Sequence, residues 1–322
     1  MIALTIKKNT VINLTGILFS FAYGLLVVAS AQRLYLLEDG DISRYVNFFQ
    51  TYDLTTSYDR FSVRGDGVFR TAINLLKEFF NTEAITVLTS IGFLTSSIIF
   101  SIYSINIRSS KYLISISPLF LMVFLTPMVI TLFSDQLRST IAFTILMVAM
   151  IYTKGVVRYS LFGLASLMHM AMVPIISLYF FFHIVNRIRI RSDFIIPLVA
   201  LLLVSSLIPI AAYTLQFNVT NASQGIYYNF LIFCITLLII FTYKKAINNI
   251  YGFISIALLL IYFSGQIIDI SYIRYVGYAI VLYLFFLIDR GEVGSVKVFT
   301  VGYAPFFLLT IFYKFANYGW QF

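Results

Sequence analysis

Long apolar runs separated by short polar connections occupy most of this chain. A helix needs about 20 predominantly apolar residues to cross a bilayer, and most of the runs approach this length. The runs are continuously apolar and do not alternate with period two, which excludes a transmembrane β-barrel. The pattern predicts an all-α polytopic integral membrane protein with about 10–11 transmembrane segments, forming a single membrane domain over residues 1–322. The runs lie at about 11–31, 84–105, 112–133, 137–153, 157–169, 171–186, 194–214, 226–243, 250–268, 272–289 and 296–316.

The stretch 157–187 departs from this pattern because it is too long for one span and short for two. A single helix over it would be roughly 46 Å long, against a hydrocarbon core of about 30 Å. Basic residues flank the stretch at both ends, with Lys154 before it and Arg189 after it. If both ends are cytoplasmic, the chain must turn back between His169 and Pro174, where the proline removes a helical hydrogen bond. We therefore expect a short hairpin of broken helices here.

With this hairpin, Lys and Arg are in excess on the predicted cytoplasmic connections, whereas acids and bases nearly balance on the outer face. This asymmetry follows the positive-inside rule and places the N-terminus in the cytoplasm. We expect 11–31 to be a retained helix and not a cleaved signal peptide. The largest outer-face (periplasmic) loop is then 32–83.

Two stretches of this outer loop have the apolar spacing of amphipathic helices. Such helices lie on the membrane surface or cap a helix bundle. The apolar positions are Tyr45, Phe48, Phe49 and Tyr52 in the first stretch, and Phe69, Ala72, Ile73, Leu76 and Phe80 in the second.

Composition supports the membrane class and narrows the chemistry. The chain is 60% hydrophobic and 11% charged, whereas soluble domains carry about 25% charged residues. The net charge of +9 comes from residues scattered at helix ends, so nucleic acid is not an expected partner. The single cysteine, Cys234, allows no disulfide framework, and no His, Asp or Glu cluster has metal-ligand spacing. We expect no metal and no other cofactor.

Polar residues gather on the predicted outer face. Guanidinium groups grip phosphate oxygens with two hydrogen bonds, and a neutral histidine can accept a proton from a hydroxyl. The candidates are His169, Asp135 and Arg138 at helix ends, Arg274 and Tyr278 four residues apart on one helix face, and Arg64, Asp66 and Arg70 in the long loop.

Each candidate also has a structural interpretation, which the sequence leaves open. His169 could be a packed helix-end residue bonded to a backbone carbonyl. Asp135 with Arg138 could form an ordinary interfacial pair. Arg274 with Asp269 could anchor a helix end among interfacial tyrosines.

Four short motifs occur in order along the chain. An Asp followed by an aromatic residue stands in the early outer loop, as Asp41-Ile42-Ser43-Arg44-Tyr45. An Arg-x-x-hydrophobic-Ala pattern opens a helix as Arg138-Ser139-Thr140-Ile141-Ala142. The set is completed by an Ala-x-x-x-His pattern, Ala165-Ser166-Leu167-Met168-His169, and an Arg-x-x-x-Tyr pattern, Arg274-Tyr275-Val276-Gly277-Tyr278. In this order the motifs resemble those of the EpsG-like and Wzy-type bacterial polysaccharide polymerases.

The resemblance implies a glycosyltransferase that polymerises undecaprenyl-diphosphate-linked oligosaccharide repeats by metal-independent block transfer on the outer face of the bacterial cytoplasmic membrane. Its product would be O-antigen of lipopolysaccharide or an exopolysaccharide. His169 would be the general base or would position the acceptor, Arg138 and Arg274 would clamp the diphosphate, and Tyr278 and Asp41 would line the sugar path. The expected partners are the lipid-linked glycan and membrane lipids. Control of chain length would also need a partner protein, which no motif in the sequence identifies.

Two other classes of function remain open. An O-antigen ligase or another glycosyltransferase acting on lipid-linked sugars would use the same outer site. A non-enzymatic transporter or flippase of lipid-linked sugars would show broken helices in both halves of the chain, and the sequence indicates a break only in 157–187.

Overall fold

The computed structural model describes residues 8–38, 40–51, 67–107, 110–187, 226–241, 246–267 and 273–318. Within these ranges the chain forms thirteen α-helices and no strand. Three of the described helices are long and apolar enough to cross a membrane, or four if α6 and α7 make one broken span. The predicted class, an all-α polytopic membrane protein, is confirmed.

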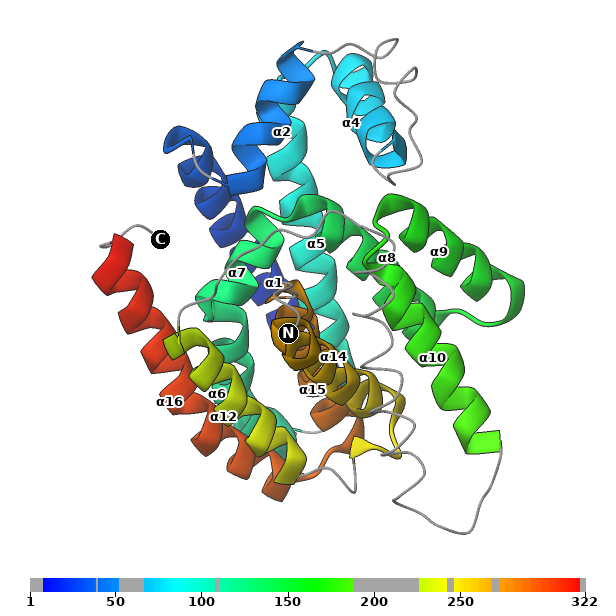
Figure 1. Ribbon diagram of the computed structural model, residues 1–322, viewed down its shortest axis with the longest axis vertical. Helices are drawn as coiled ribbons and strands as arrows, with labels where there is room; N and C mark the ends of the chain where they lie inside the picture. The colour runs from blue at the N-terminus through cyan, green and yellow to red at the C-terminus, as the bar shows by residue number, and fades with distance from the viewer. Residues whose placement is uncertain are drawn as a thin grey trace, which may run out of the picture. The chain divides into compact units, whose positions relative to one another are not determined.

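The helices fall where the apolar runs predicted them, and α2 and α4 are the two expected amphipathic helices (Figure 1). The predicted run 194–214 lies outside the described residues. The helices are α1 (Lys8–Leu36), α2 (Gly40–Thr51), α4 (Gly67–Phe80), α5 (Ala84–Asn106), α6 (Ser110–Leu125), α7 (Pro127–Ser134), α8 (Leu137–Tyr152), α9 (Gly155–Met168), α10 (Met172–Arg187), α12 (Ile226–Phe241), α14 (Ile250–Ile267), α15 (Ile273–Arg290) and α16 (Val293–Tyr318).

The predicted break in 157–187 is confirmed between α9 and α10. His169 leaves the helix with extended backbone (φ −158, ψ 116), and its N–H still donates to the Ala165 carbonyl. The His169 carbonyl accepts a hydrogen bond from the N–H of Met172 at 3.0 Å, which starts the next helix. Pro174 lies in the first turn of α10, where a missing N–H leaves no helical bond unmade. The return of the chain to the same membrane face stays a prediction.

A second break, between α6 and α7, corrects the prediction of one uninterrupted span over 112–133. Pro127 has no N–H, so the helical hydrogen-bond ladder stops at Thr126. The Thr126 hydroxyl donates to the Met122 carbonyl at 2.7 Å, and the Thr126 N–H donates to the Val123 carbonyl at 3.2 Å. The Met122 and Val123 carbonyls therefore each keep a donor at the break.

The described residues group into two compact units within the chain that sequence analysis treats as one membrane domain. Unit 1 comprises α1, α2, α4, α5, α7, α8 and α9. Unit 2 comprises α6, α12, α14, α15, α16 and α10 from Pro174 onward.

In unit 1, α1 packs along α5, and α8 packs between α5 and α9. Small residues allow the close approach of α1 and α5: a Cβ at Gly16 would collide with Ser104. The Ser101 hydroxyl donates to the Ser20 hydroxyl at 3.0 Å in the same contact. Apart from its packing surface, α1 exposes Leu18 and Phe19, as expected of a helix that faces lipid.

In unit 2, α14 packs along α15, and α6 packs along α16. Every side chain of α15 from Tyr275 to Ile288 is buried, which makes α15 the central helix of this unit. The Tyr283, Phe299 and Tyr303 rings pack in sequence, with neighbouring centroids 4.7 Å and 5.8 Å apart. The Tyr303 hydroxyl is 2.8 Å from the Thr126 hydroxyl and so ties α16 to the end of α6.

Candidate functional site

An apolar cluster at one end of unit 1 gathers the helices that carry most of the candidate residues. We call it the α2–α4 cluster, because these two helices supply half of its buried members. Tyr45, Phe48, Ile141 and Met168 pack against it from the side. The buried members are Ala31, Ile42, Val46, Phe49, Phe69, Ile73, Ala84, Val87, Leu88 and Leu137.

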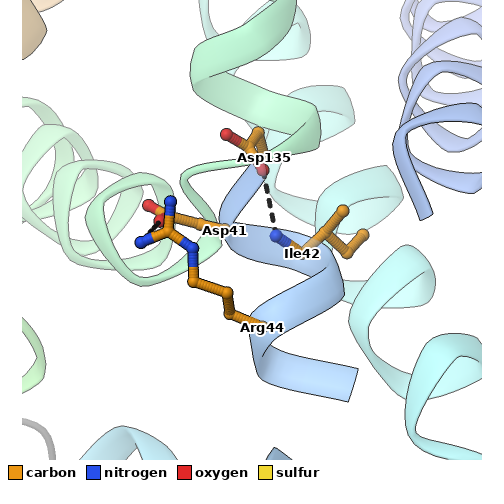
Figure 2. A network of polar contacts seen from close by, with 4 residues as sticks. All are labelled: Asp41, Ile42, Arg44 and Asp135. Carbon is orange, nitrogen blue, oxygen red and sulfur yellow. Dashed lines mark hydrogen bonds and ion pairs between the residues drawn. The ribbon is translucent and has the colours of Figure 1, made fainter. Parts of the chain in front are cut away.

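Asp135, in the turn between α7 and α8, fixes the start of α2. Its Oδ1 accepts a hydrogen bond from the backbone N–H of Ile42 at 2.9 Å (Figure 2). The first N–H groups of a helix lack helical acceptors, and a carboxylate there also interacts favourably with the helix dipole. Gly40 permits the approach, since its φ is +77 and a Cβ would collide with the Asp135 carboxylate. One oxygen of the predicted substrate-binding Asp135 therefore supports α2.

Asp41, beside this cap, forms an ion pair with Arg44 one helical turn further on. The distance from Oδ1 to Nη1 is 3.5 Å, and the Arg44 side chain is 79% exposed while that of Asp41 is 20% exposed (Figure 2). A pair this exposed contributes little to stability. The structure thus presents a carboxylate and a guanidinium at the surface of α2, and the sugar-path role of Asp41 stays a prediction.

Aromatic rings of α2 hold two of the candidate arginines. The Arg138 guanidinium lies 6.0 Å from the centroid of the Tyr45 ring, and the Arg70 guanidinium lies 4.2 Å from that of Phe48. A cation over an aromatic face is attracted by the ring quadrupole. Neither Tyr45 nor Phe48 is predicted as a site residue: Tyr45 is the aromatic residue of the Asp41–Tyr45 motif, and the spacing of Phe48 indicates only an apolar helix face.

His169 lies at the same end of unit 1 as Arg138 and Asp135. Only Thr153 and Lys154 connect α8 to α9, so these packed helices run antiparallel. Gly155, with φ +56, makes the tight turn. Because the two helices have similar lengths, the last turn of α9 returns to the first turn of α8. Met168 accordingly packs against the α2–α4 cluster, and the Nε2 atom of the partly exposed His169 is buried.

The opposite end of the α8–α9 hairpin is closed by Arg158. Its Nε donates to the Thr153 carbonyl at 2.8 Å and to the Ala149 carbonyl at 3.2 Å. A cation at the end of a helix binds the last carbonyls and complements the dipole. This contact keeps α9 in register with α8, and so fixes the place of His169.

Arg274 and Tyr278 belong to unit 2. Both lie near the start of α15, four residues apart on one helix face, as predicted. Arg274 is half-buried, while Tyr278 is fully buried and packs against Tyr275 with ring centroids 6.3 Å apart. A joint site of Arg274 with Arg138 and His169 stays a prediction. Arg64, Asp66 and Asp269 lie outside the described residues.

Within the described part of the chain, no group of three or more His, Cys, Asp or Glu residues is placed to hold a metal ion. The described site therefore offers arginines, one histidine and carboxylates: groups that bind anions, accept protons and accept hydrogen bonds.

Comparison of the chain with models of protein families, with curated proteins and with solved structures found no match in any of the three. The fold and its apolar helices define the protein as an all-α polytopic membrane protein.

Proposed function

We propose that the protein is a membrane glycosyltransferase that joins oligosaccharide repeats carried on a polyprenyl diphosphate such as undecaprenyl diphosphate. One observation carries the proposal: unit 1 places Arg138 and Arg70 over the aromatic rings of α2, at the same end as the helix break at His169. This arrangement combines fixed positive charge for a diphosphate with a group that can accept a proton.

The proposed reaction breaks the bond between the anomeric carbon of the growing glycan and its lipid diphosphate. A hydroxyl of the incoming repeat forms the new glycosidic bond and gives its proton to His169. The diphosphate leaves with the bonding electrons, and Arg138 and Arg274 stabilise its charge. Because the arginines supply this stabilisation, the proposed reaction calls for no metal.

Charge at the two ends of unit 1 supports an orientation with the site outside. Among the described residues, the end opposite the α2–α4 cluster carries Lys154 and Arg158 and no acid. At the cluster end the described acids and bases balance. By the positive-inside rule, the basic end, opposite the α2–α4 cluster, faces the cytoplasm. We accordingly propose a bacterial inner-membrane protein with a cytoplasmic N-terminus and a periplasmic site.

A deletion strain tests the proposal, complemented with the wild type, with His169→Ala and with His183→Ala. His183 is the matched control because it is the other histidine of the chain, and its side chain is exposed. We expect long glycan with wild type and His183→Ala, and only single repeats with His169→Ala at equal membrane levels. Glycan of normal length from His169→Ala would rule out the proton-acceptor role.

Arg274→Lys tests the clamp from unit 2. Lysine keeps the charge but lacks the planar pair of donors that grips two phosphate oxygens. We expect shorter or less glycan from Arg274→Lys. Unchanged chain length would mean that Arg274 does not bind the diphosphate in this way.

A transporter of lipid-linked sugars is the second candidate, and the break at Thr126 favours it. The described residues contain two broken helices, α6–α7 and α9–α10, and transporters often bind substrate at such breaks. The same strains separate the candidates. Loss of a transporter leaves lipid-linked repeats on the cytoplasmic face, loss of a polymerase leaves single repeats on the surface glycan, and loss of a ligase leaves no repeat attached.

A further inference from the structure

The C-terminal half of helix α4 exposes large apolar side chains. Leu75 is 50% exposed, Phe79 is 82% exposed and Phe80 is 64% exposed, with Leu76 beside them. At 100° per residue, Leu75, Leu76 and Phe79 fall on one side of the helix. The spacing in the sequence predicts Leu76 and Phe80 on the same apolar face as Phe69 and Ile73, but only Phe69 and Ile73 are buried in the α2–α4 cluster.

Three polar side chains of α4, those of Arg70, Asn74 and Lys77, face the protein instead, whereas Glu78 is exposed. Asn74 is fully buried. The Lys77 ammonium donates to the Phe49 carbonyl at 2.7 Å, near the end of α2, and the Arg70 guanidinium lies over the Phe48 ring. A helix packed on a protein in water normally has the reverse arrangement, with its apolar stripe inward and its charges outward.

The neighbouring helix α2 shows that reverse arrangement. It buries Ile42, Val46 and Phe49, and its outward side chains are Arg44, Asn47 and Gln50. The two helices touch through the Tyr45 and Phe69 rings, 5.3 Å apart, and lie beside each other at the same end of unit 1 (Figure 1). The outward face of α4 is thus rich in large apolar side chains and that of α2 is polar, so the two adjoining helices are suited to lipid and to water, respectively.

We propose that α4 is an interfacial helix whose outward face, Leu75, Leu76, Phe79 and Phe80, binds the lipid of the outer membrane leaflet, while the outward face of α2 faces water. With 14 residues α4 is about 21 Å long, too short to cross the membrane. The chain turns at Asn81 (φ 46) and continues directly into α5, which is long and apolar enough to span. The exposed stripe therefore ends within a few residues of the point where the chain enters the bilayer.

An interfacial position also accounts for the inward polar contacts. In-plane helices bury their apolar face about 5–10 Å into the boundary between headgroups and acyl chains. At that depth Arg70 and Lys77 would be costly if they pointed outward. On the protein side, the Phe48 ring contacts the Arg70 guanidinium and the Phe49 carbonyl accepts a hydrogen bond from the Lys77 ammonium. The proposal concerns membrane contact and does not depend on the proposed glycosyltransferase activity, although the choice of the outer leaflet rests on the proposed orientation.

Depth-dependent quenching on the full-length protein tests this placement. Cys234→Ser removes the single cysteine, and Phe79→Cys then carries an environment-sensitive fluorophore; Gln50→Cys on α2 is the matched control. The labelled proteins are reconstituted in phosphatidylcholine vesicles. We expect blue-shifted emission at position 79, with strong quenching by nitroxide-labelled lipid and weak quenching by aqueous iodide. At position 50 we expect the reverse, with strong quenching by iodide and weak quenching by nitroxide-labelled lipid.

Two results would overturn the proposal. Iodide could quench position 79 as strongly as position 50, which would place the face in water. Alternatively, neither quencher could reach position 79, which would mean that protein, either another part of this chain or a second copy, covers the face. If Phe79→Cys does not insert, Leu75→Cys gives the same readout from the same stripe.

Discussion

The Asp135 carboxylate accepts a hydrogen bond from the backbone N–H of Ile42 at 2.9 Å, across 93 positions of sequence. This bond ties the turn between α7 and α8, where the candidate Arg138 begins its helix, to the helix whose Tyr45 ring lies under the Arg138 guanidinium. The bond from Ile42 to Asp135 therefore both supports the start of α2 and helps to keep the Tyr45 ring next to Arg138.

We expect Asp135→Ala to destabilise the protein by about 1 kcal/mol, because helix-capping side chains contribute roughly this much. Asp135→Asn keeps an acceptor oxygen and should lose less. Thermal unfolding in detergent measures both. Asp41→Ala is the control, since its partner Arg44 is highly exposed and the pair should contribute well under 1 kcal/mol. Equal stability of Asp135→Ala and wild type would show that the cap contributes nothing.

Gly40→Ala should destabilise the protein through the same contact. An Ala side chain is strained at φ +77 and would also collide with the Asp135 carboxylate. The two substitutions share this contact, so their effects should not add, and Gly40→Ala should cost less in an Asp135→Ala background. Additive losses in the four-variant unfolding series would contradict a shared contact.

The overall helix pattern could be read from the sequence because the bilayer sets both the length and the composition of a span. The break at His169 could also be predicted, because a helix over 157–187 would be too long for one span and Pro174 would interrupt its hydrogen bonds. The break at Thr126 was missed although Pro127 marks it. The Thr126 hydroxyl stabilises that break by donating to the Met122 carbonyl, and it also contacts Tyr303, which lies 177 positions away and cannot be inferred from local spacing.

The outward face of α4 shows a second limit of sequence analysis. Helical spacing identifies an apolar arc, yet both the protein core and the lipid accept apolar side chains. Phe69 and Phe80 therefore look equivalent in the sequence, although one is fully buried and the other 64% exposed. Similarly, spacing alone does not show that Tyr45 receives Arg138 from a helix far along the chain.

The Thr126–Tyr303 pair should be important for unit 2, since both residues are buried. Thr126→Val removes the hydroxyl and deprives the Met122 carbonyl of a donor, which should cost about 1–3 kcal/mol. Tyr303→Phe should cost less, because Thr126 still bonds Met122. Unfolding midpoints in detergent measure both. A larger loss for Tyr303→Phe than for Thr126→Val would contradict this account of the break.

The proposed orientation predicts which ends react with reagents added outside the cell. On the Cys234→Ser background, Arg44→Cys at the cluster end should react with a membrane-impermeant maleimide in intact spheroplasts. Lys154→Cys, exposed at the opposite end, should react only after the membrane is permeabilised. Labelling of Lys154→Cys from outside, with Arg44→Cys protected, would invert the orientation and place the candidate site in the cytoplasm.

Arg138 links the geometry of unit 1 to the proposed reaction. Arg138→Lys keeps the charge but loses the guanidinium over the Tyr45 ring and the two-pronged grip on phosphate, so we expect much shorter glycan in the complemented deletion strain. Tyr45→Phe keeps the ring face and should preserve chain length. Tyr45→Leu removes the face, which at about 0.5–1 kcal/mol predicts roughly two- to fivefold less polymer. Immunoblots of membranes confirm equal insertion. Normal glycan from Arg138→Lys, or equal losses from Tyr45→Phe and Tyr45→Leu, would show that the ring does not hold Arg138 for the reaction.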